Sequence, residues 1–323
     1  MTAAARSGPG RREVLSGAAA ALALSPSPAL GQLAGLEVLA GGPPGDGQDQ
    51  LARAIAEGLA LTKLTPRAMP INVPRDQDAL DSFLSGKRPR AALMVVGLST
   101  IGGLQVANAG DLLDRSHPLC RVLGEHLPLV VRADSKLRSM QELAESIRKD
   151  AGAISWTGRG KGSADHQLAL RVTEAAGGDI HRLDYRPFGT SAEASNAALQ
   201  GKTTVATGAL IEFVAQIKGG TLRALALASP ERAEGLDIPT LKEAGLDVAH
   251  LNWRGVVSRD AVGRTLIDRY GEAIARVVRT PGWIELMKQR YWVDLFQPAD
   301  AFQTFLAAER LRVGALLKKA GPL

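Results

Sequence analysis

The chain has 323 residues, enough for two domains of ordinary size. Hydrophobic residues make up 45% and charged residues 22%, as in soluble globular proteins, and no apolar run reaches the roughly 18 residues of a membrane span. The formal charge of +6 is a mild excess, without a basic stripe interleaved with aromatic residues, so the composition argues against nucleic-acid binding.

A single cysteine, Cys120, excludes an internal disulfide, and one thiol alone makes no zinc site. We expect this residue to be buried as a small apolar side chain. The five histidines are scattered and show no metal-binding spacing, so neither a metal nor a cofactor is predicted.

The first 31 residues have the order of a secretory signal peptide. Arg11 and Arg12 precede a short apolar stretch at 17–24, and a small-residue segment ends at Gly31. The paired arginines resemble the twin-arginine type, and we expect cleavage near Gly31 and a periplasmic protein. The alternative is a disordered cytoplasmic tail. Because ATP and nicotinamide cofactors are largely cytoplasmic, we do not expect an exported protein to use them.

The first elements alternate between strand and helix. Residues 36–40 form a short apolar strand candidate, and a loop rich in glycine and proline follows at 41–48. A helix comes next, because Leu51, Ile55 and Leu59 recur at fourfold spacing on one face. Residues 90–96 are predicted to be another strand.

The same alternation continues downstream, with strands predicted at 127–131, 153–157, 203–207 and 222–227. Ser139 and Glu142 form a capping box that begins one helix, and Ser163 can cap another after the tight loop at 158–162.

Towards the C-terminus, Pro239 and Thr240 are predicted to begin a short helix that Gly245 ends. The tail from 262 to 319 is predicted to be mostly helical, with interruptions at Pro281–Gly282 and at Pro298.

Strand–helix alternation indicates an α/β architecture with parallel sheets, in which ligands bind beyond the carboxyl ends of strands. Two glycine-rich loops fit that rule, one at 41–49 and one at 157–163, in different halves of the chain. A helix start leaves backbone N–H groups unpaired and carries partial positive charge, while glycine allows close approach. Facing each other, the two loops would grip an anion from both sides without requiring an arginine.

The candidate ligand-binding residues are therefore those of the two loops. They are Gly45, Asp46, Gly47, Gln48 and Asp49 in the first, and Thr157, Gly158, Arg159, Gly162 and Ser163 in the second. The alternative is that both loops are only helix N-termini, where an acidic residue is favoured without any ligand. Asp46 would repel an anion unless it points away or meets a cation, and Arg159 and Lys161 could add positive charge.

Other motifs are weaker. Ser163, Asp165 and His166 suggest a hydrolase, but they lie on one helix turn and cannot line up as nucleophile, base and orienting group. We expect His166 to pack or hydrogen-bond near the second loop. Residues 201–203 look like the end of a phosphate-binding loop, but Asn196 stands where that motif needs glycine. Trp156 and Trp253 are expected in the core.

Five segments, in order, resemble the Bug/TctC family of tripartite tricarboxylate transporter binding proteins. The similarity is strong over 127–259, moderate over 36–53 and faint elsewhere. The segments are Pro44–Asp49 with Arg53 after it, Gly160–His166, Asp184–Gly189, Ile217–Ala226 and Ile238–Leu246 with Trp253 after it.

The resemblance implies a type II periplasmic binding protein fold, with two parallel-sheet-based domains around a central ligand cleft. Domain 1 would hold residues 32–124 and 248–323, and domain 2 residues 125–247. Strands near 127–131 and 251–257 would form the hinge for closure. Further lining residues implied in this way are His166, Tyr185, Phe188, Thr190, Thr207 and Gly208.

Three departures from the family pattern bear on the ligand. Asp46 stands where the family usually has glycine, the segment Asn72–Asp78 replaces a glycine-rich region, and Gly208 replaces a common aspartate. That aspartate is associated with ligands bearing an amino group, so its absence argues, by resemblance, against an amino-acid ligand.

The first hypothesis is therefore a monomeric, non-enzymatic binding protein that captures a small organic carboxylate for the membrane permease subunits of such a transporter. The second is a relative that presents its ligand to a membrane sensor kinase without transport. A secreted hydrolase is a third, for which the sequence offers no nucleophile–base arrangement.

Overall fold

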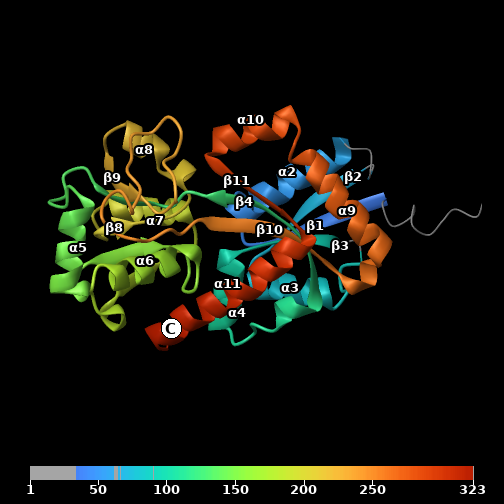
Figure 1. The fold of residues 1–323 in the computed structure, drawn as a ribbon, viewed down its shortest axis with the longest axis horizontal. Helices are drawn as coiled ribbons and strands as arrows, with labels where there is room; N and C mark the ends of the chain where they lie inside the picture. The colour runs from blue at the N-terminus through green and yellow to red at the C-terminus, as the bar shows by residue number, and fades with distance from the viewer. Residues whose placement is uncertain (1–33, 62–64, 66, 90, 323) are drawn as a thin grey trace, which may run out of the picture.

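The computed structural model describes residues 34–322 except 62–64, 66 and 90, so the predicted signal peptide lies outside the described residues. The chain forms two lobes, each built on its own β-sheet (Figure 1). We call the part around the six-stranded sheet lobe 1 and the part around the five-stranded sheet lobe 2. Lobe 2 lies on the left of Figure 1 and lobe 1 on the right.

The sheet of lobe 1 has the strand order β11-β4-β10-β3-β1-β2. Its strands are β1 (Ala34–Gly41), β2 (Arg67–Val73), β3 (Ala91–Gly97), β4 (Ser116–Glu125), β10 (Asn252–Arg259) and β11 (Trp292–Pro298). The first three run parallel, whereas β10, β4 and β11 each pair antiparallel with their neighbour. The central strand β3 is buried at every position, as its continuous apolar sequence requires.

Within the described residues, the helices of lobe 1 are α2 (Gly47–Leu61), α3 (Asp76–Leu84), α4 (Leu98–Val106), α9 (Arg264–Val277), α10 (Pro281–Arg290) and α11 (Ala299–Ala320). In α2, Leu51, Ile55 and Leu59 are fully buried, which confirms the helix and the face that their spacing predicted.

The sheet of lobe 2 has the order β7-β6-β8-β5-β9. Its strands are β5 (Pro128–Arg132), β6 (Ser155–Gly158), β7 (Asp184–Pro187), β8 (Val205–Ala206) and β9 (Leu222–Leu227). Its helices are α5 (Met140–Lys149), α6 (Ala164–Ala175), α7 (Ser191–Leu199) and α8 (Val214–Lys218). Strands β7, β6 and β8 are parallel and β5 pairs antiparallel with β8 and β9, so both sheets are mixed rather than purely parallel.

Short 3₁₀ turns complete the described chain: η1 (Leu112–Arg115), η2 (Ala151–Ala153), η3 (Ile180–Arg182), η4 (Leu210–Glu212) and η5 (Asp260–Val262). No helix in the described part of the chain is both long and apolar enough to cross a membrane.

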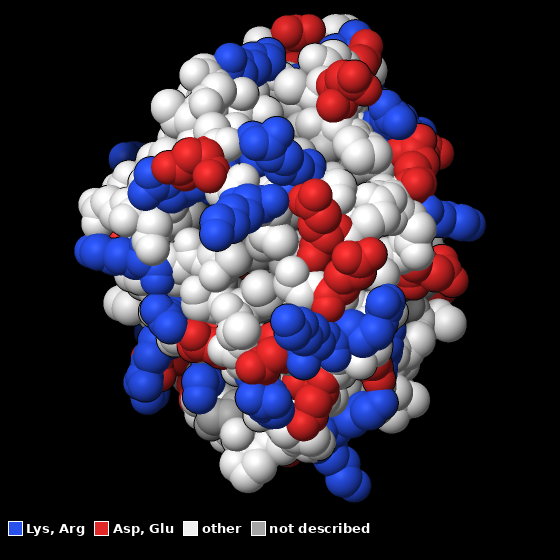
Figure 2. Space-filling view, turned by 90° about the vertical axis from the view of Figure 1, so that its left-hand side faces the viewer, with Lys and Arg blue, Asp and Glu red and all other residues white. Residues whose placement is uncertain are grey.

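The chain changes sheets between β4 and β5 and again between β9 and β10, and both connections run between the lobes in Figure 1. Helix α11 packs on α4 and β4 and also reaches α6 of lobe 2. One apolar cluster continues through both lobes and includes Met94 and Phe302 of lobe 1 with Leu129 and Trp156 of lobe 2. Charges of both signs are interspersed over the face of lobe 2 that Figure 2 shows.

Three side chains are buried as their residue types predicted. Cys120 is 1% exposed and burial raises the pKa of its thiol to about 12, which confirms a buried, unreactive side chain. Trp156 and Trp253 both lie in the core, as predicted.

The short helix predicted after Pro239 is wrong. Thr240 and Glu243 do form reciprocal capping hydrogen bonds, but the chain makes only one turn before Gly245, at φ +88°. Thr240 instead forms a parallel bridge with Leu227, so pairing with β9 overrides the local capping signal.

The tail is mostly helical, as predicted, but it also contains a strand. The interruption predicted at Pro281–Gly282 falls where α9 has ended at Val277 and α10 begins at Pro281, because proline suits the first helical turn and Thr280 caps it. Residues 292–298 form the edge strand β11, for which the sequence shows no clear alternation. Tertiary pairing with β4 defines this strand.

Candidate functional site

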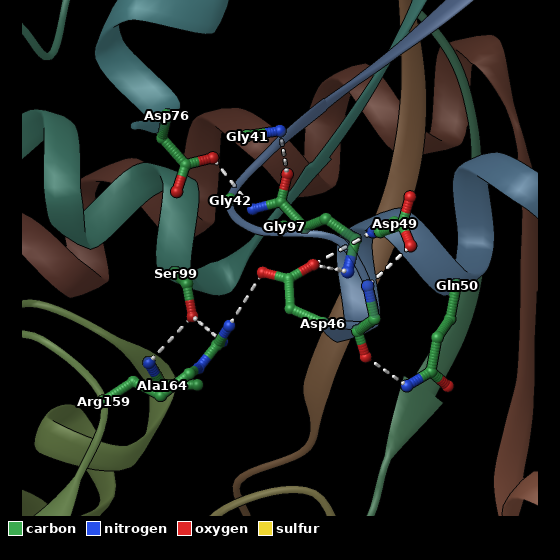
Figure 3. A network of polar contacts seen from close by, with 12 residues as sticks. Gly41, Gly42, Asp46, Asp49, Gln50, Asp76, Gly97, Ser99, Arg159 and Ala164 are labelled. Atoms are coloured by element: carbon green, nitrogen blue, oxygen red, sulfur yellow. Dashed lines mark hydrogen bonds and ion pairs between the residues drawn. The ribbon is translucent and has the colours of Figure 1, made fainter. Parts of the chain in front are cut away.

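The two glycine-rich loops lie against each other at the boundary between the lobes. We call residues 41–49, between β1 and α2, the first loop, and residues 157–163, between β6 and α6, the second loop. Directly after the second loop, the backbone N–H of Ala164 donates to Ser99 Oγ at the start of α4, 3.1 Å away (Figure 3). The fold therefore brings together two helix starts from different lobes.

The first loop satisfies its N–H groups with its own carboxylates. Asp46 Oδ1 accepts hydrogen bonds from the backbone N–H groups of Gln48 at 2.9 Å and Asp49 at 3.0 Å. Asp49 Oδ2 accepts from the Gly45 N–H at 2.7 Å and from Arg53 Nε at 2.8 Å. The donors that were expected to hold a ligand are engaged within the chain, because acidic side chains stand at this helix start.

Two buried groups hold the first loop in place. The side chain of Gln48 accepts from the Gly41 N–H at 3.2 Å and donates to Asp76 Oδ1 at 2.8 Å. A Cβ on Gly47 would lie 2.1 Å from Nη2 of Arg254, so only glycine fits against that guanidinium group. Arg254 forms a buried ion pair with Glu125. Gln48 and Gly47 thus shape the loop.

The second loop uses neutral groups instead. Ser163 Oγ accepts from the His166 N–H at 3.3 Å and so caps α6, as predicted. The Gly162 N–H donates to Nδ1 of His166 at 3.1 Å. Burial and the charge of Lys161 lower the pKa of His166 to about 4, so its imidazole is neutral at physiological pH. His166 therefore packs and hydrogen-bonds near the loop, as expected.

Tyr185 and Asp165 support the backbone of Arg159. The Tyr185 hydroxyl donates to the Arg159 carbonyl at 2.6 Å, and its ring lies 4.5 Å from that of His166, centroid to centroid. Asp165 Oδ2 accepts from the Arg159 N–H at 2.8 Å. A Cβ on Gly158 would lie 2.5 Å from the Cβ of Asp165, so this glycine allows the close packing.

The side chain of Arg159 crosses from lobe 2 to lobe 1 (Figure 3). Its Nη1 lies 3.3 Å from Asp46 Oδ2, and its Nη2 donates to Ser99 Oγ at 3.0 Å. Both charged side chains are mostly buried, with 16% of Arg159 and 13% of Asp46 exposed. Asp46 thus meets a cation.

Acidic groups dominate the surroundings of Arg159. Burial lowers the pKa of the guanidinium group, but the negative charges of Asp165, Asp46, Glu125 and Glu212 raise it overall. Burial raises the pKa of Asp165, although Arg159 opposes that shift. The boundary between the lobes therefore favours a positive charge at the place that Arg159 occupies.

The remaining predicted residues have varied positions. Thr157 Oγ1 donates to the Arg186 carbonyl at 3.1 Å, and Thr190 caps α7 in a capping box with Glu193. The N–H of Phe188 donates to the Gly158 carbonyl at 3.0 Å. Thr207 is fully buried, and its hydroxyl makes no hydrogen bond to any residue that the structure describes.

Gly208 lies beside an acidic side chain. A Cβ at this position would lie 3.4 Å from Oε2 of Glu212. The charge of Glu212 also acts on Arg159. This part of lobe 2 therefore carries a carboxylate although position 208 is glycine.

The hydrolase arrangement does not form. Ser163 Oγ accepts from the backbone of His166, and the imidazole Nδ1 faces the Gly162 N–H. Asp165 binds the Arg159 backbone instead of orienting the imidazole. In the described part of the chain, no three His, Cys, Asp or Glu side chains are grouped to hold a metal ion.

The lobe 1 residues that meet Arg159 and the loops were not predicted from the sequence. Ser99 follows β3 at its carboxyl end, where the rule for α/β sheets places ligand sites, so its position was a usable signal. Arg254 lies in β10 and Glu125 ends β4, and their pairing is a long-range contact that no local pattern shows.

Two cavities lie away from the loops. One, of about 820 Å³, is lined by His126, between β4 and β5, and by residues of α10 and β11. The other, of about 840 Å³, lies between η1, the start of β4 and α9. Neither includes a residue of the two loops, which touch each other directly in this structure.

Two mixed α/β lobes, joined by crossing connections and meeting at helix starts, define a two-domain fold of the periplasmic binding protein class. The tripartite tricarboxylate transporter family receptor (TctC) profile matches residues 112–321, and the chain belongs to this family. The family and its structural neighbours are substrate-binding proteins, not enzymes, and this family implies an extracytoplasmic location.

Curated relatives are distant. A UPF0065 protein of Pseudomonas sp. (strain P51) is 27% identical over 175 residues, 52% of this chain and 51% of that one. A UPF0065 protein of Agrobacterium vitis is 23% identical over 292 residues, 87% of this chain and 82% of that one. The chain thus spans about half the length of the first relative.

Solved structures share the fold. The periplasmic binding protein BugD has a TM-score of 0.75 and 21% identity, covering 89% of this chain and 98% of that one. MatC of Rhodopseudomonas palustris, solved with malate, has a TM-score of 0.71 and 18% identity, covering 88% and 98%. An R. palustris protein solved with adipate has a TM-score of 0.75 and 16% identity, covering 89% and 97%.

Proposed function

We propose that this chain captures a small organic carboxylate between its two loops and delivers it to the membrane permease of a tripartite tricarboxylate-type transporter. The observation that carries the proposal is Arg159, a mostly buried guanidinium group that reaches from the second loop to the first. Family membership supports it, as do the malate and adipate found with two proteins of the same fold.

Capture requires the lobes to separate, because Arg159 and Ala164 now contact Asp46 and Ser99. A guanidinium group binds a carboxylate through two parallel N–H···O bonds, which supplies both affinity and orientation. Ser99 offers a hydroxyl from lobe 1, and closure removes the bound anion from water. The two connections between the sheets are the segments about which such a motion would occur.

Thermal shift and calorimetry of the purified full chain with mono-, di- and tricarboxylates would test this proposal. At least one carboxylate should raise the melting temperature and bind with a defined stoichiometry. Replacing Arg159 by Gln should weaken that binding by roughly 10- to 100-fold, the range for a hydrogen bond to a charged group. Replacing Arg75, an exposed arginine paired with Asp78, by Gln should leave it unchanged. Silence of the folded protein across the panel would contradict the proposal.

A further inference from the structure

The ion pair between Asp46 and Arg159 restricts what can enter between the loops. It joins the lobes at 3.3 Å, and neither side chain is more than 16% exposed. Nη1 of Arg159 contacts Asp46 and Nη2 contacts Ser99, so a solute carboxylate that binds through Nη1 takes the place of Asp46 on that guanidinium group. The fate of Asp46 then contributes to the affinity.

A solute with only negative charge would leave Asp46 without its cation. Removing one partner of a buried ion pair is strongly unfavourable. The N–H groups of Gln48 and Asp49 bind only Oδ1 of Asp46, so Oδ2 would lose the partner that Arg159 provides. Asp165, Glu125 and Glu212 act on Arg159 through their charges, so the site already holds an excess of acid. A second carboxylate on the solute would add to that excess.

Among the described residues, the other cations near the first and second loops already have a different partner or face solvent. Arg254 pairs with Glu125 in the interior and lies against Gly47. Arg53 binds Asp49 and is 56% exposed. Lys161 lies on the second loop and is exposed to solvent. To pair with Asp46 in place of Arg159, each of these cations would have to give up its present partner or its contact with water.

We propose that the solute carries an ammonium group as well as a carboxylate, so that it bridges Arg159 and Asp46 as a zwitterion. Its carboxylate replaces Asp46 on Arg159, and its ammonium group replaces Arg159 on Asp46. Each member of the pair exchanges one ionic partner for another, and the net charge between the lobes is unchanged. This inference rests on the proposed function and narrows the solute class to amino-bearing carboxylates.

The absence of an aspartate at position 208 argued against an amino-bearing solute, but Glu212 supplies a carboxylate at the same place. Gly208 stands where an aspartate would have suggested an amino group, but the Glu212 carboxylate lies 3.4 Å from the Cβ position of that glycine. An acidic group is therefore present beside position 208, supplied by η4 rather than by the residue itself.

The experiment uses solute pairs that differ only by an amino group: alanine with propionate, aspartate with succinate, and glutamate with glutarate. Calorimetry on the full chain should show the amino-bearing member of the preferred pair binding at least about tenfold more tightly, since the other leaves a buried charge unpaired. Asp46→Asn should abolish that preference. Asp46→Ser, which keeps a helix-capping oxygen without the charge, should do the same if the first variant is poorly folded.

Asp78→Asn is the control, because Asp78 is an exposed acid that pairs with Arg75 and not with Arg159. It should keep the wild-type ratio within each pair. A wild-type protein that binds the members of a pair equally would overturn the inference, and so would an Asp46→Asn variant with an unchanged ratio. Binding of carboxylates without a preference for the amino group contradicts this inference alone. Absence of binding by the folded protein to all six solutes and to the wider carboxylate panel contradicts the proposed function.

Discussion

The first and second loops look alike in sequence but present opposite charges to each other. Both follow a parallel strand, contain glycine and begin a helix. In the first loop a carboxylate, Asp46, satisfies the helix start, whereas a hydroxyl, Ser163, does so in the second. The first loop therefore carries a negative charge that needs a partner, and Arg159 of the second loop supplies it.

A glycine-rich helix start does not by itself define an anion site. The residue that caps the helix decides whether the loop offers N–H donors or a charged acceptor. Here one lobe presents an acceptor and the other a donor, so a charged contact crosses the boundary between them.

The largest expected effect concerns the support of the first loop. Arg254 pairs with Glu125 in the interior, with side-chain exposures of 3% and 4%. Replacing Arg254 by Met should lower the free energy of unfolding by about 3–5 kcal/mol, because Glu125 is left buried without its cation. Urea denaturation measures the change. Arg75→Met, at an exposed pair, should cost at most about 1 kcal/mol, and equal losses in the two variants would contradict this account.

The next effect tests the contact between the lobes. A Cβ on Gly102 of α4 would lie 1.8 Å from the Gly162 carbonyl oxygen of the second loop, whereas one on Gly103 meets nothing within 4 Å. Gly102→Ala should hold the lobes apart and weaken solute binding roughly 10- to 100-fold, if the usual overpacking cost of about 1–3 kcal/mol falls on the closed state. Gly103→Ala should change neither the separation of the lobes nor the affinity for the solute.

Calorimetry and small-angle X-ray scattering measure the affinity and the radius of gyration of both variants. A Gly102→Ala protein with wild-type affinity and an unchanged radius would show that closure does not depend on this contact.

The second loop should also respond to pH through His166. Burial lowers the pKa of His166 from 6.5 to about 4, so the unfolded chain binds a proton that the folded chain refuses between those values. The free energy of unfolding should therefore fall as the pH drops from about 6.5 to about 4, by up to about 1.4 kcal/mol per pH unit for this residue. Burial raises the pKa of Asp165, which acts in the opposite direction near the acid end.

Denaturation at a series of pH values tests this expectation. His166→Gln should flatten the dependence between pH 6.5 and 4, while His181→Gln, at an exposed position, should not. If the free energy of unfolding depended on pH in the same way in the wild-type and His166→Gln proteins, His166 would not be buried as a neutral imidazole.

The smallest expected effect concerns the neutral cap of the second loop. Ser163→Ala removes one hydrogen bond at the start of α6 and should cost about 1 kcal/mol of stability, as is usual for an N-cap. Thermal denaturation measures the loss, and Ser139→Ala at α5 should give a similar value. A loss several times larger at Ser163 would mean that its hydroxyl supports more than the cap.

Local patterns allowed much of this site to be predicted, because caps and turns depend on near neighbours. The second loop, its cap at Ser163 and the packed His166 followed from residue types and spacing. The partners of Asp46 could not be predicted in this way, since Arg159 lies 113 positions further along the chain. Tertiary pairing likewise produced β11 and the bridge at Thr240, where the local sequence indicated otherwise.

A crystal structure of the full chain with the tightest-binding amino-bearing carboxylate tests the central claim most directly. The account predicts the solute between the two loops, its carboxylate on Arg159 and its ammonium group on Asp46, with those two side chains no longer paired. A solute in the cavity beside His126, with the Asp46–Arg159 pair intact, would contradict it.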